Sequence, residues 1–155
     1  MRAKNSQVII CLLIFFLFAD QALAEDWKFR ALLPRGTGYY DKSSIKKINE
    51  KISHVWTVTI YNEKGKADAF SLLKKQDKAP DNPEILSQEL VLLEFDCVNE
   101  KYRIASMDIY DEKENLLLSV PEIDAEWHDI IPNSINEILK KIVCSVGENS
   151  NKEKK

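Results

Sequence analysis

The chain is poor in the residues that most metal sites and active sites require. Among its 155 residues are two histidines, three cysteines and four glycines. His54 and His128 have no second histidine or cysteine at ligand spacing, so no metal-binding motif is present. The glycines form no phosphate-binding loop, and no serine occupies the strand-turn-helix elbow of a hydrolase. We therefore expect no cofactor, no metal and no catalytic residue, and a protein that is not an enzyme.

The sequence also lacks a long block of one charge. It has 22 basic and 25 acidic residues, for a formal net charge of −3. Proteins that bind nucleic acid attract phosphates through clustered lysines and arginines. Nucleic acid is therefore not an expected partner, and the length fits a single domain with its own core.

Residues 1–24 predict a secretory signal peptide. A basic start precedes the apolar run Val8–Phe18, and Ala22–Ala24 supplies the small residues that a signal peptidase reads. The run is about half of the roughly 20 residues that cross a bilayer, so cleavage before Glu25 is favoured over a retained membrane helix. A lipid anchor at Cys11 is disfavoured because bulky isoleucines precede it. We expect an exported protein, periplasmic, cell-surface or secreted, with no stable membrane span.

Export would leave two cysteines, Cys97 and Cys144, in an oxidising compartment where thiols pair. We expect one disulfide between them; the alternative is two separate buried thiols. By the loop-entropy estimate, closing a loop of about 48 residues is worth roughly 4 kcal/mol.

The centre of the chain, Gln88–Tyr110, is typical of two strands joined by a polar turn at Asn99-Glu100. Two-residue alternation places Val91, Leu93 and Phe95 on one face of the first strand. In the second strand the same alternation places Ile104 and Ile109 on opposite faces. Further strands are predicted by alternating or β-branched runs at Asp26–Leu33, Tyr39–Asp41, His54–Tyr61 and Leu116–Val120.

Ser134 and Glu137 have the spacing of a reciprocal helix cap, and an apolar stripe follows them. The stripe consists of Ile135, Ile138, Leu139, Ile142 and Val143. The sequence thus predicts an α+β domain over residues 25–147: a single antiparallel meander of about five to six strands, a C-terminal helix packed on one face, and one disulfide. Gly147 suits the end of the helix, and residues 148–155 predict a disordered polar tail.

The sequence predicts the secondary structure of two segments less clearly. Lys46–Ser53 has only two isoleucines at helical spacing, and a loop or a short turn fits it as well as a helix does. Glu63–Asp81 begins with a predicted turn at Gly65 and ends in a proline-containing loop. Lysines along it are either a patch for an anionic partner or, more commonly, solvated loop residues.

Several short motifs, each weak alone, follow one another in a distinctive order and spacing along most of the chain. They are Trp27, Tyr39-Tyr40-Asp41, Ser43-Ser44-Ile45, Val55-Trp56, Glu94-Phe95-Asp96-Cys97, Tyr102-Arg103, Ile131-Pro132-Asn133-Ser134 and Cys144. With these motifs the chain resembles the surface-adhesin protein E-like family of small exported bacterial proteins. The resemblance implies an antiparallel sheet with a C-terminal helix fastened by a disulfide. It also implies an adhesin that attaches to host matrix or serum proteins, although Glu63–Lys78 departs from the family pattern.

Three other residue groups have both a functional and a structural interpretation. Asp41, Asp96 and Arg103 could form a carboxylate–guanidinium cluster, for which a structural role is favoured. The aromatic residues Tyr39, Tyr40, Trp56 and Trp127 could line a groove for a peptide or glycan, but core packing is the stronger interpretation. The residues from Glu126 to Asp129, with His128 among them, could form an acid/base site, against which a surface loop is favoured.

The sequence therefore favours a non-enzymatic exported bacterial binding protein that recognises a protein partner at the cell envelope. The alternative is a structural or accessory periplasmic protein with no host ligand. No binding residue is identified, and open sheet edges also favour a homodimer.

Overall fold

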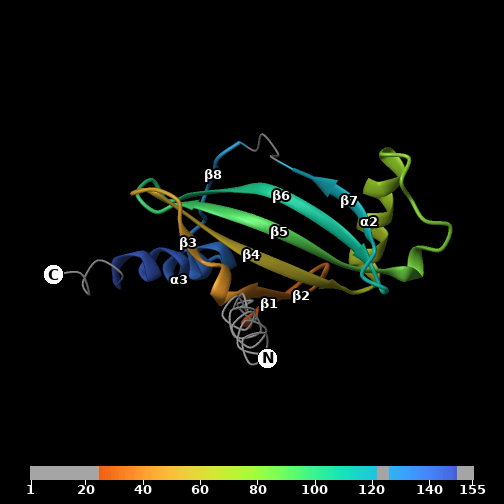
Figure 1. Ribbon diagram of the computed structural model, residues 1–155, viewed down its shortest axis with the longest axis horizontal. Helices are drawn as coiled ribbons and strands as arrows, with labels where there is room; N and C mark the ends of the chain where they lie inside the picture. The colour runs from red at the N-terminus through yellow and green to blue at the C-terminus, as the bar shows by residue number, and fades with distance from the viewer. Residues whose placement is uncertain (1–24, 122–125, 150–155) are drawn as a thin grey trace, which may run out of the picture.

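The computed structural model describes residues 25–121 and 126–149. The predicted signal peptide and the tail from Ser150 onward lie outside the described residues. All strands join one antiparallel sheet with the main order β1-β2-β4-β5-β6-β7, and two short strands pair at its margins (Figure 1). The strands are β1 (Trp27–Leu33), β2 (Gly36–Asp41), β3 (Lys46–Lys47), β4 (Ile52–Tyr61), β5 (Leu86–Asp96), β6 (Lys101–Asp111), β7 (Leu116–Val120) and β8 (His128–Asp129).

Two α-helices accompany the sheet, α2 (Glu63–Lys75) and α3 (Ile135–Asn149), with short 3-10 turns at Lys42–Ser44 and Pro83–Ile85. The predicted α+β meander with a C-terminal helix and one disulfide is confirmed. Within the described residues, no helix combines the length and hydrophobicity that crossing a bilayer requires.

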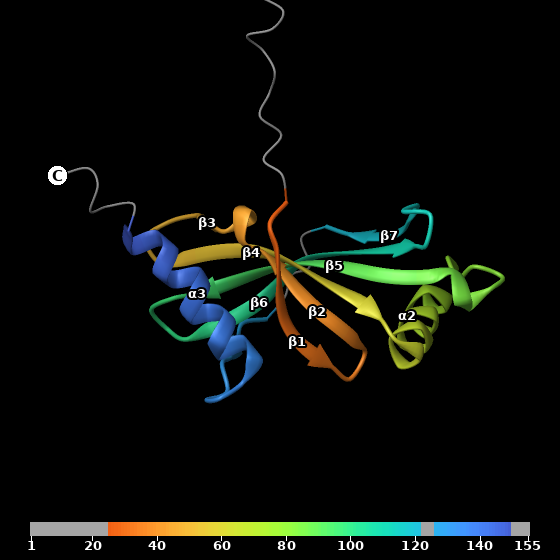
Figure 2. The ribbon, with the colours of Figure 1, turned by 90° about the horizontal axis from the view of Figure 1, so that it is seen from below.

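Both helices pack on the same face of the sheet, at opposite ends (Figure 2). Val55 and Tyr61 share a face of β4 because an even number of residues separates them. Val55 lies in a core cluster with Leu139 of α3, whereas Tyr61 lies in a second cluster with Leu73 of α2. The sheet therefore has one covered face and one face on which the described residues place no helix.

A β-bulge in β6 determines which side chains reach the covered face. Leu92 pairs with Ser106 and Leu93 pairs with Ile104, which leaves Ala105 as the extra residue. The extra residue shifts the alternation by one position. Ile104 and Ile109, predicted to lie on opposite faces, therefore both join cores on the covered face.

Helix α2 corrects the prediction of a turn and loop after Glu63. Asn62 caps the helix by accepting a hydrogen bond from the backbone N–H of Gly65 at 2.9 Å. Gly65 is a close-approach residue within the first turn, because a Cβ there would lie 2.1 Å from the carbonyl oxygen of Arg35. Ala69 and Leu73 are fully buried on the same helical stripe. The lysines that made this segment look like a loop occupy the remaining helix surface.

The first hairpin turns at Pro34-Arg35, and β2 begins at Gly36, three residues before the predicted start at Tyr39. Gly36 has a φ of 152°, and a Cβ there would lie 1.9 Å from the carbonyl oxygen of Ile60. Only glycine satisfies both conditions. The segment Lys46–Ser53 contains no helix. A short turn joins β3 at its start to β4, which begins at Ile52, and the Ile48 N–H donates to the Ile52 carbonyl across this turn at 2.8 Å.

The predicted reciprocal cap of α3 forms, except that Glu137 accepts from the N–H of Asn133 where the N–H of Ser134 was expected. Ser134 Oγ accepts a hydrogen bond from the Glu137 N–H, while the Glu137 carboxylate accepts one from the Asn133 N–H. The buried face of α3 is narrower than the predicted apolar stripe, because Leu139 and Val143 are buried but Ile138 is 58% exposed. The helix also continues to Asn149, beyond the end predicted at Gly147.

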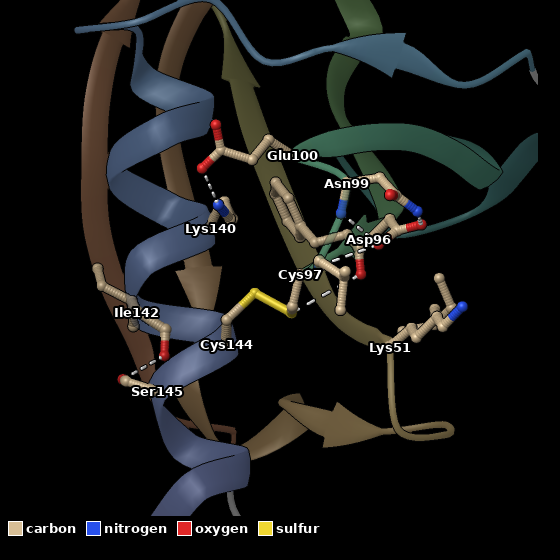
Figure 3. The surroundings of a disulfide bond; sticks show 12 residues. Lys51, Asp96, Cys97, Asn99, Glu100, Lys140, Ile142, Cys144 and Ser145 are labelled. Carbon is tan, nitrogen blue, oxygen red and sulfur yellow. Dashed lines mark hydrogen bonds and ion pairs between the residues drawn. A yellow bond between two sulfur atoms is a disulfide. The ribbon is translucent and has the colours of Figure 1, made fainter.

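The Cys97–Cys144 disulfide joins the end of β5 to α3 across 47 residues of sequence, with the two Cα atoms 5.8 Å apart (Figure 3). Lys140, one turn earlier on α3, forms an ion pair with Glu100 at 2.7 Å. The Cys97 N–H donates to the Lys51 carbonyl at 2.8 Å. The bridge therefore fixes the helix at the end of the central hairpin.

Three aspartates hold loops by accepting hydrogen bonds from nearby N–H and hydroxyl groups. Burial by itself raises the pKa of Asp41 and of Asp96, but their hydrogen bonds outweigh it and leave each pKa below its ordinary value. The side-chain hydrogen bond from Asn115 is the main cause of the lowered pKa of Asp111. The donors are Asp26 and Ser43 for Asp41, Val98 and Asn99 for Asp96, and Lys113 and Asn115 for Asp111.

These lowered pKa values predict loss of stability in acid. Because the folded carboxyls bind protons less readily than the unfolded ones, they stabilise the protein at pH values above 3.8, the ordinary pKa of an aspartate. That stability falls progressively as the pH drops below about 4. Urea midpoints measured across this range should decline for the wild type and decline less for Asp96→Asn, which begins lower. The exposed loop variant Asp81→Asn is the control, and a wild-type midpoint that stayed constant below pH 4 would refute the assignment.

Candidate functional site

The uncovered face of the sheet carries an unusual number of apolar side chains. Trp56, Val58 and Ile60 alternate onto it from β4, and register places Leu90 of β5 beside Val58. A sheet with one face on a core normally turns polar residues to water on the other. Four large apolar residues of this face are substantially exposed: Phe29 (60%), Leu32 (77%), Ile60 (40%) and Leu116 (53%). We call this surface the open face.

A hollow of about 670 Å³ lies in the open face. Its lining comes from β1, β2, β4, β5, β6 and the turn after β6, so it spans most of the sheet. The lining residues are Glu25, Trp27, Tyr39, Val58, Ile60, Gln88, Leu90, Tyr110 and Glu114. Aliphatic and aromatic side chains predominate, with acidic residues among the remainder.

Specific contacts hold the aromatic residues of the hollow. The indole N–H of Trp27 donates to the Glu25 carboxylate at 2.7 Å. Tyr39 meets Phe29 edge to face, with ring centroids 6.1 Å apart. Tyr110 is partly buried, and burial together with the charge of Asp108 raises the pKa of its hydroxyl. Trp27 and Tyr39 are thus each held by a neighbouring side chain.

The predicted cluster of Asp41, Asp96 and Arg103 does not form. The two aspartates cap separate loops, as described above. Arg103 instead forms an ion pair with Glu94 at 2.7 Å and lies against the Trp127 ring, 4.8 Å from its centroid. This pair lies on the open face, to which Glu94 is directed by its register opposite His54.

The four aromatic residues considered for a groove also separate. Tyr39 lines the hollow, whereas Tyr40 packs against the core under α3. Trp56 belongs to the open face by alternation but does not line the hollow, and Trp127 covers Arg103. Trp27 and Tyr110, which complete the aromatic lining, were not predicted.

The lysines of α2 are partly neutralised within the protein. Lys64 lies 2.7 Å from Asp68, and Lys66 lies 2.9 Å from Glu84. Lys74 and Lys75 are in the last turn, where positive charge complements the helix dipole. An anionic-partner patch therefore receives little support.

The two histidines lie among packing contacts of the sheet, far apart in the sequence and without a second histidine beside either. Burial lowers the pKa of His54, and the His128 ring packs against Tyr102 in a tilted arrangement, with centroids 5.7 Å apart. Asp129, beside His128, is exposed and faces Lys101 at 3.4 Å. Within residues 25–121 and 126–149, no group of three or more histidine, cysteine or acidic side chains is arranged to hold a metal ion.

The fold and the open face define a class: a small disulfide-bonded α+β domain whose sheet has one helix-covered face and one face with exposed apolar side chains. The chain belongs to the family described as surface-adhesin protein E, which matches residues 32–145. It is thus an adhesin-like surface protein by family. A comparison with curated proteins found no match.

Two solved structures are similar to this chain, and both are protein E of Haemophilus influenzae. The selenomethionine form is 18% identical to this chain, and the match covers 81% of this chain and 95% of that chain, with a TM-score of 0.46. Crystal form II is also 18% identical, covers 79% of this chain and 94% of its own, and has a TM-score of 0.44.

Proposed function

We propose that this protein is a non-enzymatic binding module that is exported to the cell envelope and recognises a protein partner through the open face of its sheet. Membership of a surface-adhesin family supports binding as the general role. The observation that carries the proposal is the exposure of Phe29, Leu32, Ile60 and Leu116 on one face. Large exposed apolar side chains gathered on one face of a domain are typical of interaction sites.

The partner class we propose is an extracellular-matrix or serum protein of a host. An adhesin of this family needs a surface that remains available outside the cell, and the two helices leave the open face free in the described structure. Aromatic residues such as Trp27 and Tyr39 are the side chains that contribute most binding energy at protein interfaces. The second candidate, a periplasmic accessory protein without a host ligand, would use the same face for an envelope protein.

Substitutions on the two faces test this proposal. Leu32→Glu and Leu116→Glu each place a charge on the open face outside the lining of the hollow, where a bound partner would have to desolvate it. The matched control is Ile138→Glu, because Ile138 is 58% exposed on α3 and outside the open face. Binding of each purified variant to a panel of matrix and serum glycoproteins can be measured by surface plasmon resonance.

We expect the open-face variants to lose at least tenfold in affinity and the α3 control to remain within twofold of the wild type. Circular dichroism and thermal melts verify that all variants are folded. Equal binding by all variants would exclude the open face as the binding surface. Binding to envelope proteins alone would favour the periplasmic candidate.

A further inference from the structure

The hollow combines an aromatic and aliphatic interior with acidic groups. Trp27, Tyr39 and Tyr110 contribute aromatic rings, and Ile60 and Leu90 contribute aliphatic surface. A cation on an apolar stem is complementary to such a site, because the stem packs on aliphatic surface and the charge is attracted to ring faces.

The carboxylates at the hollow have the positions of counter-ions. Glu25 and Glu114 belong to the lining itself. Asp108 pairs in register with Leu90, a lining residue, and its carboxylate accepts a hydrogen bond from the Ser119 hydroxyl at 2.6 Å. All three are acceptors for a charged N–H donor.

No basic side chain compensates these acids within the lining that the structure describes. Arg103, an arginine of the open face outside this lining, is already paired with Glu94 at 2.7 Å. Cleavage before Glu25 would add one positively charged α-amino group. The net charge of this group with the carboxylates of Glu25, Asp108 and Glu114 would still be negative. The hollow therefore repels polyanions such as nucleic acid, acidic membranes and sulfated glycans.

We propose that the hollow binds a lysine or arginine side chain carried by a basic, partly apolar segment of the partner protein. The inference rests on the proposed function and deepens it by naming the chemistry of the partner. The negative charge of the hollow favours a basic partner segment over an acidic or purely apolar one. Trp27 has a central role, because its ring and the carboxylate of Glu25, joined by a hydrogen bond, contact the same cation.

Synthetic peptides test the chemistry without a natural partner. The probes are fluorescein-labelled Gly-Ile-Arg-Ile-Arg-Gly and its acidic counterpart Gly-Ile-Glu-Ile-Glu-Gly, with a sulfated polysaccharide as the polyanion. Fluorescence anisotropy should show saturable binding of the basic peptide to the mature protein, and at least tenfold weaker binding of the acidic peptide. Raising the salt concentration should weaken the basic complex, since exposed charge pairs are screened.

Charge-matched variants locate the site. Glu25→Gln combined with Glu114→Gln should weaken the basic peptide about tenfold, and Trp27→Ala should do so by a similar factor. The control is Glu50→Gln combined with Glu63→Gln, which makes the same charge change at exposed positions outside the hollow. The control should remain within twofold of the wild type.

Three results would overturn the inference: no saturable binding of the basic peptide, equal binding of the acidic peptide or polyanion, or equal weakening by the control. Each leaves the proposed function testable by itself. If Leu32→Glu still abolishes binding to the partner protein, the open face binds by a different chemistry. If Leu32→Glu has no effect there, the proposed function is wrong whatever the peptides show.

Discussion

Replacing both Cys97 and Cys144 by serine should lower the free energy of unfolding by about 4 kcal/mol. The bridge closes a sequence separation of 47 residues, so its loss restores much conformational entropy to the unfolded chain. For a domain of this size the melting temperature should fall by roughly 10–20 °C. Urea unfolding of the exported protein, with and without reductant, measures the effect.

The double serine variant supplies its own control, because reductant should leave its unfolding curve unchanged. Reductant should move the wild type toward the variant. If both thiols of the native exported protein react with an alkylating reagent, or if the two proteins unfold at the same urea concentration, the bridge does not exist in solution.

Phe95→Ala should destabilise the domain by about 3–5 kcal/mol. Phe95 is fully buried, and it packs in the cluster with Leu139 and Val143 that attaches α3 to the sheet. Truncation removes apolar contacts and leaves a cavity that the sheet and the disulfide-linked helix close only partly. Chemical unfolding monitored by circular dichroism gives the magnitude.

Phe29→Ala is the matched control, because the same side chain is 60% exposed on the open face. Its loss should cost less than about 1 kcal/mol, since little surface is buried there. Similar losses for Phe95 and Phe29 would mean that the open face is packed against something in the folded protein, and would contradict the assignment of faces.

Local sequence patterns predicted much of this architecture. The alternation in His54–Tyr61 gave β4, with extension to Ile52 as the only change. The pair Ser134 and Glu137 marked the start of α3, and an exported chain with two remaining cysteines indicated their pairing. In each case the determining interactions lie within a few residues of sequence or follow from one chemical constraint.

Helix α2 was missed for a tertiary reason. Gly65 and several lysines are ordinary turn and loop residues in isolation, and Gly65 in a helix costs about 1 kcal/mol relative to alanine. The close approach of the helix to the Arg35 carbonyl requires this glycine. That approach depends on the first hairpin, which no local pattern in the segment reveals.

The exposure of apolar side chains on the open face was not predicted, because strand register determines which residues reach that face. Both faces of the central strands are partly apolar in sequence, as is typical of inner strands, so alternation alone does not show which face the helices cover. The bulge at Ala105 directs both Ile104 and Ile109 to the covered face, and the two helices join them there. The apolar residues on the other side are left exposed, and Trp27, Tyr39 and Tyr110 come together only through the order of the strands.

Hydroxyl-radical footprinting read by mass spectrometry tests the central claim, that both helices cover one face and the other face binds. In the free protein, Phe29, Leu32 and Ile60 should be oxidised readily, while Leu73 of α2 and Leu139 of α3, which are buried against the sheet, should not. Addition of a saturating partner should protect the open-face residues and leave Ile138 unchanged. Protection of Ile138 with Leu32 and Ile60 still reactive would contradict the account.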